Sequence, residues 1–225
     1  MNKFLELNNI SKTFETSKKL KVIKNLSYNF KKGKIYSLMG PSGSGKSTLL
    51  NLISLIDKPS NGLIKFNKHQ INYDKKEQND QLRAKKIGIV YQQNNLLPDF
   101  TSLENIYLAS LSINNNKNLA ISKAKQLLQK IGLSSRADHY PSQLSGGEAQ
   151  RIAIARAIIN DPEIILADEP TGSLDMRTAK VIFNLLKDQK RSNRLIIFAT
   201  HNRFFGNKAD CLLEILNGKI KSSNG

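Results

Sequence analysis

Residues 40–48 read GPSGSGKST and directly follow the apolar run at positions 35–39. Glycine tolerates left-handed backbone angles, so such a stretch can form a tight loop whose amide hydrogens point inward around an anion. The spacing of Gly40, four residues and then Gly45-Lys46-Ser47 fits a phosphate-binding loop, in which Lys46 meets the terminal phosphates and the Ser47 hydroxyl is a magnesium ligand. A flexible glycine turn before a capped helix is the structural alternative. The candidate phosphate-binding residues are Gly40, Pro41, Ser42, Gly43, Ser44, Gly45, Lys46, Ser47 and Thr48.

Two adjacent carboxylates follow a second apolar run. Asp168 and Glu169 come directly after Ile164 to Ala167, a run typical of a strand buried on both faces. Ligands of open parallel sheets bind at the carboxyl ends of the strands. Neighbouring strand residues point to opposite sides, so Asp168 can hold magnesium through water while Glu169 polarises an attacking water. A charged strand end exposed to solvent is the alternative, and it would be favoured if no phosphate loop were present.

The overall composition limits the class of protein. A chain of 225 residues can bury a full core, and no apolar run approaches the roughly 18 residues that cross a bilayer. The start, MNKFLELNNI, lacks an apolar stretch of signal-peptide length, and the single Cys211 excludes an internal disulfide, so we expect a reducing cytoplasm and Cys211 in the core. The net charge of +17 is spread over scattered lysines, which favours genome composition as much as an anionic partner.

The order of patterns indicates an α/β protein. Residues 4–10, 23–30 and 35–39 read as strands, followed by an apolar helix that begins near Ser47 and ends by Lys58. Further strands are expected at 62–67 and 87–91 on either side of a polar loop, and later at 164–167 and 195–199 around a crossover helix. Helices expected after a capping box at Thr101, around 121–131 and at 146–159 form an inserted helical part.

The motifs together resemble those of ATP-binding cassette (ABC) ATPases. Leu144-Ser-Gly-Gly-Glu148 is similar to their signature motif, and the remaining elements follow in the family's order: Gln92 as the Q-loop, Ser173-Leu174-Asp175 as the D-loop, and His201 as the switch histidine. Phe14 resembles the aromatic residue that stacks on adenine, although a core position would also explain it. The resemblance implies an α/β fold of the ABC-type P-loop NTPase class, with a RecA-like core, an N-terminal antiparallel β part and an inserted helical subdomain. We expect one domain, with 1–92 and 163–225 as the core and 93–162 as the helical subdomain.

The resemblance also implies ATP hydrolysis with Mg²⁺ by a homodimer. Glu169, His201 and Lys46 would be catalytic, and Ser47, Gln92 and Asp168 would hold the metal. Ser145, Gly146 and Gly147 begin a helix, where free amides attract anions. Because the phosphate loop already serves the chain's own nucleotide, this second anion site implies a second chain. In the family two copies face head to tail, each signature caps the other's γ-phosphate, and Asp175 lies at the dimer contact.

Within the family the chain resembles the ATPases of bacterial lipoprotein-releasing complexes. The stretches 91–105 and 167–175 carry that resemblance, which implies permease partners of LolC/LolE type, no nucleic acid, and a peripheral place on the cytoplasmic face of the inner membrane. Macrolide-exporter and FtsX-type cell-division ATPases are alternatives, as is a non-enzymatic class: a degraded ATP-binding module or a basic nucleic-acid-binding module. Asn202 and Ala149 depart from the family's usual Asp and longer polar residue.

Overall fold

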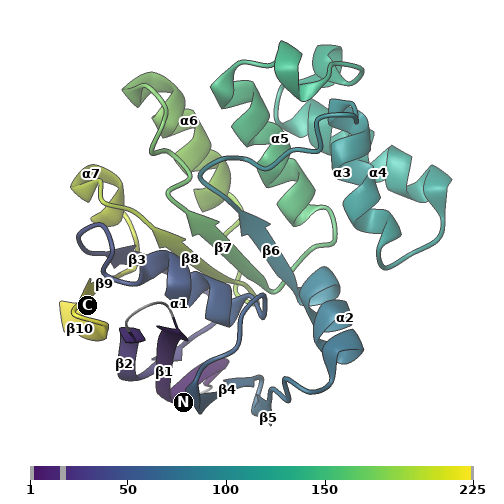
Figure 1. The fold of residues 1–225 in the computed structure, drawn as a ribbon. Helices are drawn as coiled ribbons and strands as arrows, with labels where there is room; N and C mark the ends of the chain where they lie inside the picture. The colour runs from purple at the N-terminus through teal and green to yellow at the C-terminus, as the bar shows by residue number, and fades with distance from the viewer. Residues whose placement is uncertain (1–2, 16–18, 224–225) are drawn as a thin grey trace. The chain divides into compact units, whose positions relative to one another are not determined.

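A computed structural model describes residues 3–15 and 19–223. The chain divides into two compact units, called here unit 1 (Met1–Asp80 and Lys190–Gly225) and unit 2 (Gln81–Gln189). The elements of both are labelled in Figure 1. The division at positions 92 and 163 between a core and a helical subdomain stays a prediction.

Unit 1 contains an antiparallel sheet formed early in the chain. Its strands, in the order β2-β1-β4-β5, are β1 (Leu5–Glu15), β2 (Lys19–Phe30), β4 (Asn61–Phe66) and β5 (His69–Gln70). β1 pairs with both β2 and β4 and is longer than the alternation at 4–10 predicts. Its register with β2 shifts at several points, and Asn9 within it has a positive φ of 50°. These irregularities interrupt the period-two pattern, which is why the sequence shows only the first part of the strand.

The second group of strands in unit 1 includes a mostly buried parallel set. These strands run in the order β10-β9-β3-β8: β3 (Ile35–Met39), β8 (Leu195–Ala199), β9 (Cys211–Leu216) and β10 (Lys219–Ser223). β3 pairs in parallel with β8 and β9, and every residue of β3 and β8 is buried. Continuous apolar runs are typical of such strands. Unit 1 also holds the helices α1 (Lys46–Ile53) and α7 (Arg203–Gly206).

Unit 2 combines a parallel strand pair with helices. Its strands are β6 (Ile87–Val90) and β7 (Ile164–Asp168), and its main helices are α3 (Ser102–Leu111), α4 (Lys117–Lys130), α5 (Gly146–Ile158) and α6 (Met176–Lys187). Short 3₁₀ turns occur at Ser134–Arg136 and Pro141–Gln143. α3, α4 and α5 share a buried apolar cluster that includes Ile106, Leu128 and Ile152. The helical part expected between 101 and 159 therefore has a core of its own.

Several expectations were wrong in detail. The stretch expected as a polar loop contains the helix α2 (Lys76–Lys86), which buries no residue and therefore has no apolar periodicity to reveal it. Glu77 in its first turn and basic residues in its last turn complement the helix dipole. α1 ends at Ile53, earlier than its apolar pattern indicates, because Leu55 turns the chain with a φ of 62°. Cys211 is half-buried on β9 rather than in the core.

Candidate nucleotide-binding and hydrolysis site

The phosphate loop folds as its glycines predict. Gly40, Gly43 and Gly45 all have positive φ, at 149°, 76° and 104°. A Cβ on Gly40 would lie 2.4 Å from the carbonyl oxygen of Ile215, so backbone packing and conformation both require glycine there. Gly45 precedes the first residue of α1 and has no side chain to cap it, which leaves the helix N-terminus open to an anion.

Lys46 lies buried at the base of this loop, with 8% of its surface exposed. Its ammonium donates to the carbonyl oxygens of Gly40 (2.9 Å) and Pro41 (3.0 Å). The loop thus folds around a cation held by its own backbone, and that cation is available to phosphate oxygens. Ser47 is exposed, whereas the Ser44 hydroxyl is buried with no hydrogen-bond partner in the described part of the chain.

Phe14 lies on β1, where 37% of its surface is exposed. An ordinary core position, the alternative for this ring, is therefore excluded. Phe14 pairs with Leu20 on β2, and β2 also supplies Val22 and Ile23, which border Gly45. One strand thus lies between the ring and the phosphate loop, and the Lys12 ammonium lies 5.0 Å from the ring centroid.

His201 follows β8 and is exposed. Thr200 before it is buried and donates its amide to the carbonyl of Leu38, which attaches this end of β8 to β3. Asn202 after it caps α7 by accepting from the amide of Phe204 at 2.9 Å. Asp and Asn serve equally at this cap, so the departure at Asn202 keeps the local fold.

In unit 2, the ends of β6 and β7 bring Gln92 and Glu169 together. The two strands pair in parallel up to Val90 and Ala167, so Gln92 and Glu169 each stand two residues beyond the last pair. A Cβ on Gly172 would lie 3.5 Å from both the Gln92 Nε2 atom and the Glu169 Cβ. The predicted Q-loop glutamine and the predicted base therefore converge on one turn.

The two carboxylates at this strand end differ in backbone and surroundings. Glu169 has a φ of 44°, a left-handed conformation that is strained for a non-glycine residue. Its carbonyl accepts the Gly172 amide at 3.0 Å, which closes the turn that imposes this angle. The Asp168 Oδ1 atom is buried, and no described residue donates a hydrogen bond to it. An acceptor left in this way fits a residue that receives a cation or a water from outside the protein.

The signature motif forms the N-terminus of α5. Ser145 caps the helix in a reciprocal capping box: its amide and hydroxyl both donate to Glu148 Oε2 at 2.8 Å, and its hydroxyl accepts the Glu148 amide. Arg136 donates to the other carboxylate oxygen at 2.9 Å. Ala149, the second departure, is buried in α5. This capping holds the first turn of α5 in place and thereby fixes the direction in which the backbone N–H groups of Gly146 and Gly147 point.

The lowered pKa of Glu148 gives the capping box a defined pH dependence. The bond from the Ser145 amide, followed by those from Arg136 and the Ser145 hydroxyl, lowers the pKa of Glu148 to about 2. Its unfolded value is about 4.3, so the stabilisation is complete above that pH and is lost as pH falls from there toward 2. We expect Glu148→Gln, which retains a capping side chain, to lose this pH dependence. The unfolding free energies of the two proteins should converge as pH falls from about 4 toward 2. A difference that stays constant over this range would contradict the assignment.

Gly147 also has a packing role that the motif does not reveal. A Cβ there would lie 2.4 Å from Thr178 Cγ2 on α6, so any larger residue at 147 would clash with α6. The close packing of α5 against α6 therefore requires glycine. Asp175 caps α6 by accepting from the amides of Arg177 and Thr178. A side-chain hydrogen bond from Thr178, followed by the bonds from these amides, lowers the pKa of Asp175. The signature and D-loop segments are therefore packed together in unit 2.

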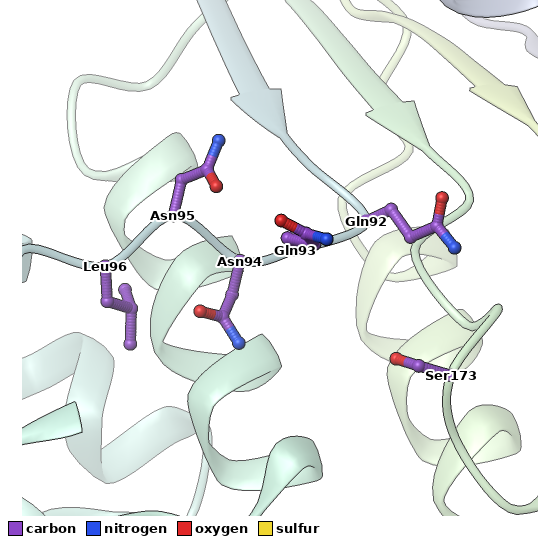
Figure 2. A pocket seen from close by; sticks show the side chains of 6 residues that line it. All are labelled: Gln92, Gln93, Asn94, Asn95, Leu96 and Ser173. Carbon is purple, nitrogen blue, oxygen red and sulfur yellow. The ribbon is translucent and has the colours of Figure 1, made fainter. Parts of the chain in front are cut away.

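A pocket of about 490 Å³ opens beside the Q-loop, lined by Gln92, Gln93, Asn94, Asn95, Leu96 and Ser173. Figure 2 shows the first five along one loop and Ser173 on another. Beyond the pocket, Asn105 is 1% exposed and bonds the carbonyls of Leu97, Phe100 and Thr101, while its oxygen accepts the Leu97 amide. Sequence reasoning missed Asn105, because a single asparagine in a helix carries no distinguishing pattern.

Sequence comparison decides the family. The profile described as "ABC transporter" matches residues 23–172, which include the phosphate loop, the signature motif and both strand-end acids. The chain belongs to the ABC transporter family. As an ABC transporter protein it is an ATPase, and the resemblance stated from its motifs is confirmed.

Named relatives match this ABC ATPase along nearly its full length. The protein named "Lipoprotein-releasing system ATP-binding protein LolD" of Rickettsia bellii is 41% identical over 226 residues, covering 99% of both chains. The protein with the same name from Ehrlichia canis is 43% identical over 225 residues, again with 99% of each chain covered.

Solved structures confirm the fold class. A dimeric structure of the ATP-binding cassette MJ0796 bound to ADP and Pi has a TM-score of 0.90 and 35% identity, covering 98% of this chain and 99% of the other. A second dimeric structure of MJ0796, described as a bacterial ABC transporter cassette, has a TM-score of 0.89. The chain therefore has the α/β fold of ABC ATPase cassettes. No helix in residues 3–15 and 19–223 has the length and apolarity of a membrane span.

Proposed function

We propose that this ABC ATPase powers the release of lipoproteins from the bacterial inner membrane as a peripheral subunit on the cytoplasmic face. The observation that carries the proposal is the near-complete alignment, at 41–43% identity, with relatives named as LolD. Its membrane partners would be permease subunits of LolC/LolE type. The macrolide-exporter and FtsX-type alternatives would use the same ATPase chemistry on other partners.

The proposed nucleotide site assigns each group a role that its local structure supports. The positive-φ loop and Lys46 bind the β- and γ-phosphates, and the exposed ring of Phe14 stacks on adenine. Glu169 accepts a proton from the attacking water, and His201 orients the γ-phosphate. In unit 2, Gln92 and the buried Asp168 Oδ1, which accepts no hydrogen bond from a described residue, offer the oxygen donors that Mg²⁺ prefers, and the exposed Ser47 hydroxyl offers one in unit 1. Bound there, Mg²⁺ would neutralise charge on the phosphates.

The active form would be a head-to-tail homodimer. The capped N-terminus of α5 presents amides of Gly146 and Gly147 in a fixed direction, which suits a phosphate supplied by a second chain. Dimeric structures of the similar MJ0796 cassette support this arrangement. ATP would hold the two chains together, and hydrolysis would release them, which converts chemistry into a mechanical stroke.

The proposed docking surface for the membrane partner is the loop around Leu97 and Phe100. Leu97 and Phe100 are 43% and 39% exposed, whereas neighbouring Leu96 packs on the helical cluster. The exposure of Leu97 and Phe100 argues against the alternative that all these apolar side chains pack the helical part, although Leu96 and Leu103 do pack there. The Asn105 side chain donates to the carbonyls of Leu97 and Phe100, so the backbone that carries the two exposed side chains is held in place.

Crosslinking tests both the surface and the cargo. With Cys211 replaced by Ser, cysteines placed at Leu97 and Phe100 are expected to capture a lipoprotein-releasing permease in membranes, because the partner's cytoplasmic helix would cover these side chains. Leu119→Cys is the matched control, since Leu119 is a similarly exposed leucine on α4. Capture of a macrolide-exporter or cell-division partner would overturn the proposed cargo, and equal capture at Leu119 would overturn the surface.

A further inference from the structure

Arg156 forms two short side-chain hydrogen bonds to the Q-loop segment that follows Gln92. Its Nη1 donates to the carbonyl oxygen of Asn95 and its Nη2 to that of Asn94, both at 2.7 Å. Such short bonds from a guanidinium are charge-assisted and hold two points of the backbone in a fixed orientation. Asn95, whose carbonyl accepts one of these bonds, has a left-handed backbone conformation with a φ of 49°.

A second bond ties the same helix to the same loop. Gln150, which is 3% exposed, donates its side-chain amide to the carbonyl of Tyr91 at 3.2 Å. Gln150 and Arg156 both belong to α5, the helix that begins with the signature motif. Three backbone carbonyls between Tyr91 and Asn95 are thus bonded by one helix, and Gln92 lies within the bonded segment. Burial lowers the pKa of Arg156, and its bond to Asn94 is part-buried, whereas its bond to Asn95 is exposed.

We infer that Arg156 is a positioning residue for the ATPase reaction: by clamping Asn94 and Asn95 to α5 it sets the position of Gln92 and makes the Q-loop move with the signature helix. This inference rests on the proposed role of Gln92 as a magnesium ligand. It adds a direct mechanical connection between the group that senses a chain's own nucleotide and the helix that would contact the partner's nucleotide. Without the clamp, Gln92 would still be present but would sample more positions.

The test compares Arg156→Met with Arg151→Met. Arg151 lies on the same helix but bonds the carbonyl of Ile131 at 2.9 Å, with a longer bond to Gly147, and forms no hydrogen bond with the Q-loop in the described part of the chain. We expect Arg156→Met to raise the Mg²⁺ concentration for half-maximal ATPase rate by about tenfold, as for loss of an outer-shell partner of a metal site. Arg156→Lys, which can reach only one carbonyl, should raise it by roughly threefold. Arg151→Met should leave it within about twofold.

A nitroxide at Gln93→Cys, with Cys211 replaced by Ser, reports the clamp without any activity. Its mobility should increase in Arg156→Met and stay unchanged in Arg151→Met. Unchanged mobility in Arg156→Met, or an equal shift of the Mg²⁺ requirement in Arg151→Met, overturns the inference. Gln92→Ala distinguishes the proposed role of Gln92 as a magnesium ligand from the proposed role of Arg156 in positioning it. An unchanged Mg²⁺ requirement in Gln92→Ala refutes the role of Gln92. A raised requirement in Gln92→Ala without one in Arg156→Met refutes only the positioning role of Arg156.

Discussion

Glu169→Gln is expected to slow ATP hydrolysis by about 10²-fold or more, which is the loss associated with removing a positioned general base. ATP binding should persist, because the substitution leaves the phosphate loop of unit 1 untouched. The amide keeps the shape of the side chain and can still occupy the left-handed backbone position. The variant should therefore accumulate as an ATP-bound dimer, which size-exclusion chromatography with and without ATP would detect.

Glu163→Gln provides the matched control for Glu169→Gln. Glu163 precedes the same strand and forms a surface ion pair with Lys86 at 2.7 Å, so it has no expected part in the reaction. Hydrolysis near the native rate in Glu163→Gln together with arrest in Glu169→Gln would support the assignment. Native hydrolysis in Glu169→Gln would move the base elsewhere, with His201 as the next candidate.

Lys46→Ala is expected to abolish tight ATP binding. The ammonium now held by the carbonyls of Gly40 and Pro41 would bind the β- and γ-phosphates, and alanine supplies no charge to replace it. Nucleotide affinity is the measurement, with circular dichroism to show that the variant folds. Lys58→Ala, at an exposed position after α1, should bind ATP normally. Unchanged affinity in folded Lys46→Ala would refute the phosphate-loop assignment.

The sequence was sufficient wherever the chemistry is local in the chain. Gly40 to Gly45 form a tight loop that leads directly into α1, because the glycines and their spacing allow that geometry. The buried strands β3, β7 and β8 were recognised from continuous apolar runs, the capping box at Thr101 is present as predicted, and Ser145 precedes a helix as predicted. In each case, residues within about ten positions carry the whole signal.

Long-range contacts and unpatterned elements could not be predicted. Arg156 meets Asn94 and Asn95 only after the chain has folded, and Gly147 needs glycine because Thr178 packs against it. The strained φ of Glu169 follows from the turn that closes at Gly172, which no local preference announces. The hairpin between β9 and β10 is different, because Asn217-Gly218 is a readable turn signal between its strands and was missed.

The left-handed backbone at Glu169 makes the residue that suits the fold best different from the residue that the proposed reaction needs. Glycine would avoid a conformational cost on the order of 1 kcal/mol that glutamate bears in this conformation, but glycine has no carboxylate. Glu169→Gly is therefore expected to stabilise the fold while removing the proposed general base. The strain at this residue is therefore accounted for by the proposed role of Glu169 as the general base.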